Sequence, residues 1–424
     1  MRAQACVRRA TAPSSWHGRG VPSALTSRCQ LQAVSSSSSV PLVYSSWYGD
    51  LGGGELRLLD HVRNTRFAGQ VTALLNAPGE LDAALKAAGA RTRVVRWKAG
   101  KSWLARQAHW YSAKARTALT LARMPRGVFV ANTFSDLETT GRVAAALGWP
   151  VVWRARADTF TQTGDWPPGR LRELVHFLNT RVARIVPTTH YEARLMQAAG
   201  VKMSKVFVVH NGVDLARYTD EAAGRALRES TGWGPEQFVL AAVARMVPQK
   251  GWEVLFEAAA QARTAGVPVK ILAAGDTTLM DGDPDAYRRS LHEHAARLGL
   301  AEHVRFLGFR SDVWAVMKAA DAFVLASLIE PFGTTVIEAM AAGRAVIASD
   351  LPGPRESVVE GETGLFFPAG DAKALAERLA ALHGDRARCG ALGRAGRARA
   401  EAVFDLERNV AELDRHCAEA AGID

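Results

Sequence analysis

The stretch VLASLIEPFGTTVIEAMAAGRAVIASD, residues 324–350, sets out the organisation of the second half of the chain. It opens on the end of a short apolar run, passes through a loop with Pro331 and Gly333, continues as an amphipathic segment ended by Gly343, and closes on a second apolar run. A strand, a loop, a helix and a second strand in this order form the unit from which parallel sheets are built. Two carboxylates, Glu330 and Glu338, lie inside this apolar unit and need an explanation.

The same alternation of short apolar runs and longer amphipathic segments extends over most of the chain. The first half holds such runs at 40–46, 70–75, 91–97, 127–132, 150–155, 183–189 and 205–211, and the second half at 238–246, 269–275, 303–309, 322–327, 344–349 and 364–368. Strands that alternate with helices predict parallel sheets with helices on both faces. We therefore expect an α/β protein with two Rossmann-like domains, at 41–220 and 221–400, and a last helix in 401–424 that can cross back to the first domain.

Composition narrows the class of protein further. The chain has 424 residues, of which 48% are apolar and 22% charged, which is typical of a folded globular protein. No run approaches the eighteen or so apolar residues of a membrane-spanning helix. The four cysteines lie at the two ends without metal-like spacing and fit a reducing compartment, so the sequence predicts a cytoplasmic protein. Residues 1–40 have five arginines, no acid and a run of serines, and we interpret them as a disordered or misassigned N-terminal extension, with a targeting segment as the alternative.

Local rules place the two carboxylates on different elements. Pro331 disfavours helical backbone at the residue before it, so Glu330 is expected on the loop. Gly333, Thr334 and Thr335 fall at the helix start, where unpaired N–H groups and the macrodipole favour an anion. Glu338 then lies one turn inside the helix. The pattern indicates two acids on either side of an anion site rather than a catalytic pair, and ordinary surface acids are the alternative.

Cations and glycines follow two other predicted strands. Arg245 lies at the end of the run 238–246, and Lys250 opens the next helix, so both are expected at the carboxyl edge of the sheet, where they suit a diphosphate. Gly53 and Gly54 follow the first strand and allow the backbone to approach a ligand. Solvated charges and a tight turn are the respective alternatives.

Five motifs in order give the sequence a specific resemblance: HNGVD (210–214), VARMVPQKG (243–251), FLGFRSDVWAVMKAADAFVLAS (306–327), EPFGTTVIEAMAAG (330–343) and GETGLFFPAGD (361–371). Together they resemble the family-4 retaining glycosyltransferases of the GT-B fold, over about residues 41–400. The resemblance implies an acceptor-binding N-terminal domain and a C-terminal domain that binds a nucleotide-diphosphate sugar.

The resemblance also implies roles for individual residues. Glu330 should contact hydroxyls of the donor sugar, and Glu338 those of the ribose. Arg245 and Lys250 should neutralise the diphosphate and, with Glu330, serve catalysis. The remaining donor contacts implied are Gly53, Gly54, Phe309, Arg310, Phe332, Gly333, Thr334 and Thr335. No cofactor and no dedicated metal are implied, and the Asp-x-Asp pattern in DGDPD (281–285) is interpreted as a solvated turn.

One departure from the family pattern concerns the segment after the strand 150–155. The family commonly has a histidine there that serves the donor, whereas this sequence reads RARAD. We hypothesise that Arg154 or Arg156 contacts a different group of the donor or acceptor, such as a carboxylate, which arginine binds with two hydrogen bonds. A structural arginine is the alternative.

Residues 91–126 carry ten Lys or Arg and no acid, with tryptophans interleaved. Between 101 and 123 one helical face holds Arg106, His109, Arg116 and Arg123, and the opposite face holds Leu104, Ala108, Tyr111, Ala115, Leu119 and Ala122. A basic amphipathic helix of this kind is typical of contact with an anionic membrane surface. The residues expected to touch lipid are Trp103, Arg106, Trp110 and Arg116. A helix packed on the core is the alternative, and no motif that reads nucleic-acid bases accompanies the charge.

The sequence therefore predicts a retaining hexosyltransferase that moves a sugar from a nucleotide-diphosphate sugar to a lipid-linked, polysaccharide or lipopolysaccharide-type acceptor in cell-envelope polysaccharide biosynthesis. Contact with the inner face of a membrane is expected to be peripheral. Two alternatives stay open at this level. One is another GT-B enzyme, a sugar-nucleotide epimerase or a phosphorylase, and the other is a protein that binds nucleotide sugars or glycans without catalysis.

Overall fold

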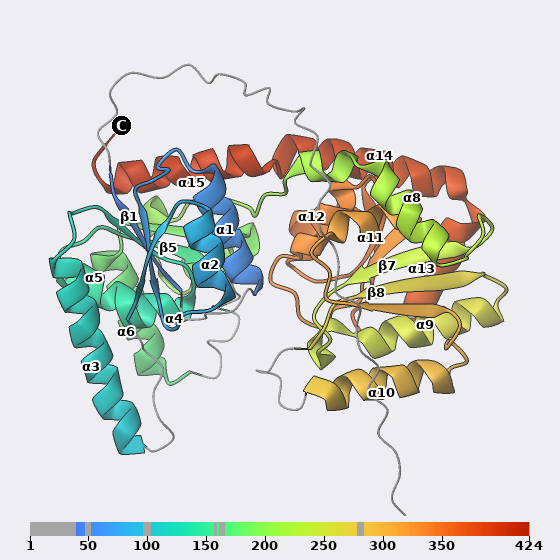
Figure 1. Cartoon of the computed structure of the whole chain (residues 1–424), viewed down its shortest axis with the longest axis horizontal. Helices are drawn as coiled ribbons and strands as arrows, with labels where there is room; N and C mark the ends of the chain where they lie inside the picture. Colours follow the sequence, from blue (N-terminus) through green and yellow to red (C-terminus); the bar gives the residue numbers. More distant parts are fainter. Residues whose placement is uncertain are drawn as a thin grey trace, which may run out of the picture. The chain divides into compact units, whose positions relative to one another are not determined.

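The structure, a computed structural model, describes residues 40–46, 52–95, 103–156, 159–160, 166–277 and 284–423, without the side chains of 103–110, 168, 284 and 285. Within these residues the chain forms two six-stranded sheets (Figure 1). We call the part of the chain around the first sheet the first lobe and the part around the second sheet the second lobe. Residues 1–39 of the predicted extension 1–40 and most of DGDPD lie outside the described residues.

The first sheet is parallel throughout and has the strand order β3-β2-β1-β4-β5-β6. Its strands are β1 (Leu42–Ser46), β2 (Val71–Leu75), β3 (Arg91–Val94), β4 (Val128–Ala131), β5 (Val151–Ala155) and β6 (Arg184–Pro187). The helices of this lobe are α1 (Gly53–Asn64), α2 (Glu80–Ala87), α3 (Trp103–Ala122), α4 (Phe134–Asp136), α5 (Arg142–Ala146), α6 (Pro168–Arg181) and α7 (His190–Ala198), with a π-helical turn at Leu137–Gly141.

The second sheet repeats this design with the order β12-β11-β10-β7-β8-β9. Its strands are β7 (Phe238–Val243), β8 (Val269–Ala274), β9 (Val304–Gly308), β10 (Ala322–Leu325), β11 (Ala345–Ser349) and β12 (Gly364–Phe367). Its helices are α8 (Glu221–Ser230), α9 (Trp252–Thr264), α10 (Pro284–Arg297), α11 (Val313–Ala319), α12 (Thr334–Ala341), α13 (Ala372–Gly384) and α14 (Arg386–Val403). Both sheets therefore have the doubly wound order of dinucleotide-binding proteins, in which the order reverses between the first and fourth strands.

Residues of one strand alternate between the two faces of the second sheet, as the pleat requires. Phe238 and Leu240 of β7 belong to a core that α9, α10 and α13 cover, whereas Val239 and Ala241 belong to a core under α11, α12 and α14. Figure 1 shows α9 and α10 on one side of this sheet and α8, α11 and α12 on the other. Because both faces are buried, the strands read as continuous apolar runs, which is why the sequence revealed them.

The chain passes between the lobes twice. Val209 belongs to a core of the first lobe and Val213 to a core of the second, so the first crossing lies at 210–212. After α14 the chain returns, because α15 (Leu406–Ala420) places Leu413 and Cys417 in the core of the first lobe. The two crossing segments pair with each other, since Val213 N–H donates to Phe404 O (2.8 Å) and Leu406 N–H to Val213 O (3.1 Å).

A buried polar cluster fixes α15 to the first lobe. The Asp414 carboxylate accepts hydrogen bonds from His61 Nε2 (2.6 Å), Thr65 Oγ1 (2.7 Å) and the Arg66 backbone N–H (2.8 Å). His61 also bonds through Nδ1 to the hydroxyl of Tyr44 on β1. A carboxylate with one hydroxyl, one amide and one imidazole donor is compensated for its burial, so this cluster binds helix and sheet together.

One predicted strand is wrong. Residues 205–211 form no strand, although Phe207 N–H donates to Ile185 O (2.9 Å) and Val209 N–H to Pro187 O (3.1 Å) beside β6. Their apolar pattern instead reflects packing at the edge of the sheet just before the crossing.

The predicted closing helix begins later than expected, at Leu406, because Asp405 caps its first turn by accepting Arg408 N–H. Among the residues that the structure describes, none of the helices has the length and apolarity to cross a membrane.

Candidate functional site

Two loops of the second lobe meet at the point where the strand order reverses. The loop after β7 carries Arg245 and Lys250, and the loop after β10 carries Glu330 and leads to Gly333. β7 and β10 are neighbours in the sheet, and ligands of doubly wound sheets bind outside the carboxyl ends of strands at such a point. The sheet order thus brings together residues that the sequence assigned to one ligand.

Gly251 makes the close approach of these two loops possible. Its backbone has φ of 63°, in the left-handed region, and a Cβ at this position would lie 2.0 Å from Ala326 O. Only glycine combines that dihedral angle with that contact. Lys250 precedes it at the end of a 3-10 turn, Pro248–Lys250, so the turn holds the base of the lysine side chain beside the loop after β10.

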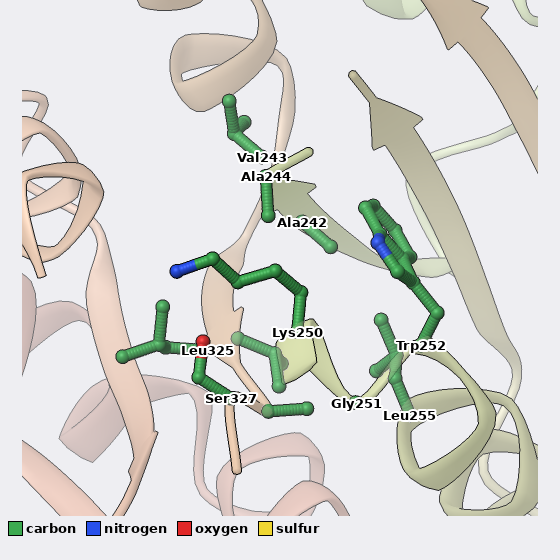
Figure 2. Close-up of a pocket in the computed structure, with 11 residues that line it drawn as sticks. Ala242, Val243, Ala244, Lys250, Gly251, Trp252, Leu255, Leu325 and Ser327 are labelled. Atoms are coloured by element: carbon green, nitrogen blue, oxygen red, sulfur yellow. The ribbon is translucent and has the colours of Figure 1, made fainter. Parts of the chain in front are cut away.

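The ammonium group of Lys250 lies against the carboxylate of Glu330. Lys250 Nζ donates to Glu330 Oε2 at 2.7 Å, and Ser327 Oγ donates to the same oxygen at 3.1 Å. Figure 2 shows Lys250 extending from the loop after β7 across the ends of the strands, on the side where Ser327 lies. Both charged side chains are largely shielded, with 19% and 11% exposed. The predicted phosphate cation and the predicted sugar acid therefore form one ion pair.

The helix α12 starts at the position that the sequence predicted. Gly333, at φ of 86°, is the N-cap, and the helix begins at Thr334. Phe332 is buried beneath the loop. The first N–H groups of a helix lack intrahelical acceptors and carry a partial positive charge. With Lys250 across the loop, this end of α12 can bind a phosphate group.

Glu338 lies one turn further into α12, as predicted, in electropositive but largely buried surroundings. Burial raises the pKa of Glu338 to about 7, whereas Arg57 lowers it, Asp60 raises it and Arg217 lowers it. Arg57 belongs to α1 of the first lobe and donates to Gly212 O (3.0 Å) at the crossing. The carboxyl is thus close to half protonated at neutral pH, and hydrogen bonds from ligand hydroxyls would favour its ionised form.

The remaining predicted residues of the second lobe lie at the rim. Arg245 is exposed, and its backbone carbonyl accepts the indole N–H of Trp252 (3.0 Å). Phe309 is 70% exposed. Arg310 forms a two-pronged ion pair with Asp312, with Nε to Oδ1 at 2.9 Å, and that guanidinium lowers the pKa of the Asp312 carboxyl. An exposed aromatic ring beside a fixed guanidinium offers a flat surface for a base.

In the first lobe, Gly53 and Gly54 begin α1, and Gly54 O accepts Asn132 Nδ2 (3.3 Å) from the loop after β4. β1 and β4 adjoin at the reversal point of the first sheet, so the two glycines occupy the place in this lobe that Lys250 and Gly333 occupy in the other. Glu55 is buried just below them and accepts a hydrogen bond from Ser46 Oγ (3.2 Å). Burial raises the pKa of the Glu55 carboxyl.

Arg154, in β5, and Arg156, directly after β5, make different contacts. Arg154 is buried and donates to three backbone carbonyls, those of Val186 (3.3 Å), Val209 (2.6 Å) and His210 (3.3 Å). These bonds occupy Nη1 and Nη2 and favour the structural alternative, and contact of Arg154 with a ligand group stays a prediction. Arg156 donates instead to two side-chain amides, Asn132 Oδ1 (3.0 Å) and Asn211 Oδ1 (3.1 Å), and remains a candidate.

Asn211 is a site residue that the sequence argument missed. Its Oδ1 accepts Arg156, and its Nδ2 donates to Thr334 Oγ1 (3.3 Å) at the start of α12. Asn211 therefore links Arg156 of the first lobe to the start of α12 in the second. The motif HNGVD was visible, but Asn-Gly signals a turn, and nothing local indicates that the amide faces two partners.

Helix α3 buries one face against the core and exposes large apolar side chains on the other. Ala113, Thr117 and Leu121 are buried, whereas Tyr111 is 69% and Leu119 57% exposed. Arg116 is exposed, and its Nε donates to Val95 O (3.1 Å). The side chains of Trp103, Arg106 and Trp110 lie outside the described residues. The predicted apolar stripe therefore faces outward where the structure describes it.

Two doubly wound lobes, with charged loops after β7 and β10, are the features by which this protein can be compared with known families. The profile "Glycosyl transferases group 1" matches residues 225–399, and "Glycosyl transferase 4-like domain" matches residues 52–212. The chain belongs to the group 1 glycosyltransferases, with the GT-B fold and a family-4-like first domain. The fold class predicted from the sequence and the resemblance to GT-B glycosyltransferases are confirmed.

Relatives and solved structures agree on the class. The D-inositol 3-phosphate glycosyltransferase of Nocardia farcinica is 37% identical over 218 residues, covering 50% of this chain and 47% of the relative. The lipopolysaccharide core biosynthesis mannosyltransferase LpsB of Rhizobium meliloti is 28% identical, covering 55% and 64%. The chain spans about half the length of the curated relatives it matches. Anabaena Alr3699/HepE, solved with UDP and glucose, superposes with a TM-score of 0.77 at 24% identity, covering 89% and 98%.

Proposed function

We propose that the protein is a retaining glycosyltransferase that moves a hexosyl group from a nucleotide-diphosphate sugar to a lipid-linked or polysaccharide-type acceptor. The observation that carries this proposal is the ion pair of Lys250 and Glu330 beside the start of α12. A cation, a helix N-terminus and a carboxylate lie together where the loops after β7 and β10 meet. A sugar diphosphate carries phosphates that suit the first two and hydroxyl groups that suit the third.

The diphosphate would lie over the start of α12. There the N–H groups of the first turn and Lys250 neutralise it, and Arg245 reaches it from the rim. Negative charge grows on the diphosphate as the glycosidic bond breaks, so fixed cations at this position stabilise the transition state more than the ground state. The cations of the site are side chains, and in this proposal the transfer needs no resident metal or cofactor.

Glu330 would exchange one partner for another when the donor binds. In the structure its Oε2 accepts Lys250 and Ser327. A bound diphosphate competes for Lys250, and the carboxylate then accepts hydrogen bonds from sugar hydroxyls. Retention follows in this family from a front-face displacement in which the departing phosphate takes the acceptor proton, a route that requires no protein nucleophile.

The nucleoside would extend away from the phosphates along α12. Glu338 would accept the ribose hydroxyls, and Phe309 with Arg310 would border the base. A UDP-sugar is the donor we favour, because the solved relative Alr3699/HepE was crystallised with UDP-glucose as well as with UDP. UDP-, GDP- and ADP-sugars can be ranked by thermal shift, since a bound ligand raises apparent stability by mass action.

The first lobe would bind the acceptor. Relatives named for inositol phosphate and lipopolysaccharide core substrates support an anionic or lipid-linked acceptor. Arg156 would then contact an anionic group of the donor or acceptor. The exposed Tyr111 and Leu119 of α3, in a segment with ten cations and no acid, favour peripheral contact with an anionic membrane surface.

The test is acceptor-dependent release of nucleoside diphosphate by the wild type, Lys250→Ala and Glu330→Gln, with the exposed lysine variant Lys373→Ala as the matched control. Lys250→Ala and Glu330→Gln should each lower kcat by about 10²-fold or more, whereas Lys373→Ala should match the wild type. Near-normal rates in the first two variants would refute the assigned roles. The anomeric configuration of the product, read by NMR, tests retention.

The same assay separates the alternatives. A protein that only binds nucleotide sugars shifts in thermal stability but releases no diphosphate with any acceptor. A sugar-nucleotide epimerase would convert the donor into its epimer without an acceptor. Neither alternative gives a glycosylated acceptor, so detection of that product by mass spectrometry decides for the transferase.

A further inference from the structure

We propose a transition-metal site, of the kind that takes zinc, formed by His190, His210 and Glu356. Each of the three side chains offers a ligand atom, and the three atoms lie within 4.8 Å of one another. His190 begins α7 and His210 precedes the crossing, both in the first lobe, whereas Glu356 ends a 3-10 turn, Pro354–Glu356, of the second. A bound ion would therefore fasten one lobe to the other.

The donor set suits zinc and similar ions. Two imidazoles and one carboxylate form a common protein ligand set for Zn²⁺, with the fourth position open to water. Bonds of about 2.0–2.2 Å place tetrahedral ligands about 3.4 Å apart. The three atoms must therefore approach one another by at most about 1.4 Å, which rotation of His190 can supply, since this side chain is exposed.

Second contacts orient two of the ligands. His210 Nδ1 bonds to Thr188 O at 2.8 Å, which makes Nε2 the ring atom that can take the metal. The Glu356 carboxylate accepts the backbone N–H of Tyr191 through Oε1 at 2.9 Å, which leaves Oε2 for the ion. A histidine whose other nitrogen bonds a backbone carbonyl is the usual arrangement at metal centres.

The backbone and rings around the cluster limit its movement. Arg399 donates to the backbone carbonyls of Glu356 (3.1 Å) and Ser357 (2.7 Å), which fixes the turn that carries the carboxylate. The His210 ring stacks on Phe332, with centroids 5.8 Å apart, and meets Phe404 edge-on. His190 meets His210 at 5.5 Å between ring centroids. The site is thus built on fixed supports, with one adjustable ligand.

The cluster adjoins the loop that carries Glu330. Phe332, against which His210 stacks, belongs to that loop. Gly353, just before the turn of Glu356, packs so closely that a Cβ there would lie 2.2 Å from Glu330 O. A metal at His190, His210 and Glu356 would therefore stiffen the donor loop from behind. It would act as a fastening between the lobes, separate from the reacting atoms.

The test is titration of the tag-free, chelator-treated full chain with Co²⁺, read by its visible d–d absorption, and with Zn²⁺ by calorimetry. We compare the wild type with His190→Ala, Glu356→Gln and the control His176→Ala, which removes an exposed histidine of α6. Glu356→Gln keeps an acceptor for the Tyr191 N–H but loses the charged ligand. Circular dichroism and the metal-free Tm establish that each variant folds.

The wild type and His176→Ala should each bind one equivalent, and both His190→Ala and Glu356→Gln should bind at least tenfold more weakly. Zinc should raise the Tm of the wild type and not that of His190→Ala. Absence of a stoichiometric ion in the wild type overturns the proposal. So does binding that survives in either His190→Ala or Glu356→Gln. These readouts require no sugar donor, so they stand or fall independently of the proposed transferase activity.

Discussion

Glu338 allows a quantitative prediction about donor binding. Burial holds the pKa of this carboxyl at about 7 in the unliganded protein. Ribose hydroxyls would donate to the ionised form and lower that pKa, so binding a UDP-sugar should release protons. If the bound pKa falls below about 5, the release is about 0.5 proton at pH 7, about 0.9 at pH 6 and about 0.1 at pH 8.

The same linkage fixes the direction of the affinity change. The proton competes with the donor below pH 7, so the apparent Kd of the UDP-sugar should be about tenfold higher at pH 6 than at pH 8. The stability of the free protein changes with pH in the opposite direction to donor affinity. Ionisation of Glu338 becomes a cost as pH rises from about 4.5 to about 7, so the stability of the unliganded fold falls across that window.

Calorimetry in buffers of different ionisation enthalpy measures the proton release directly. A UDP-sugar is the correct probe, because the terminal phosphate of free UDP itself titrates with a second pKa near about 6. Glu338→Gln should bind without proton release and with a Kd independent of pH. If wild type and Glu338→Gln release the same number of protons, the carboxyl does not face the donor and the assigned role is refuted.

Three further predictions concern α15, the loop contact and α3. Asp414→Ala leaves His61, Thr65 and the Arg66 N–H without their acceptor and should lower the free energy of unfolding by about 3 kcal/mol, measured by urea denaturation; a loss below about 1 kcal/mol would contradict the account of α15. In Gly251→Ala the new residue has an unfavourable φ of 63° and its Cβ lies 2.0 Å from a backbone carbonyl oxygen, so donor binding should be lost. The control Gly299→Ala has a similar φ of 70° with nothing within 4 Å of the Cβ, so donor binding should be kept. Equal effects of the two substitutions would count against the argument. Replacing Tyr111 and Leu119 together by serine should abolish flotation with anionic liposomes at low salt while leaving folding intact; undiminished flotation would show that this face of α3 is not the contact.

Much of the fold could be predicted because its signals are local. Strands buried on both faces read as apolar runs, and each run lies beside an amphipathic segment. The same holds for the loop of Glu330 and the helix of Glu338, since Pro331 and Gly333 set the boundary between them. The segment 205–211 misled because apolar residues beside a sheet edge have the composition of a strand.

The partners of the charged groups could not be predicted in this way. Lys250 and Glu330 are 80 residues apart in sequence and meet only because β7 and β10 are neighbours. Arg154 and Arg156 share one motif, yet one is occupied by backbone carbonyls and the other meets two amides. Position relative to a strand end predicts that a residue lies at the carboxyl edge of the sheet. Its partner depends on which other segment of the chain lies next to it at that edge.

The sequence alone determined that this protein has two α/β lobes, a helix start at Gly333 and acids on either side of it, because each rests on propensities within a few residues. Only the tertiary structure decided that Lys250 pairs with Glu330, that Asn211 joins Arg156 to Thr334, and that His190, His210 and Glu356 converge. Those contacts depend on strand order and on two crossings between the lobes, and long-range packing fixes both.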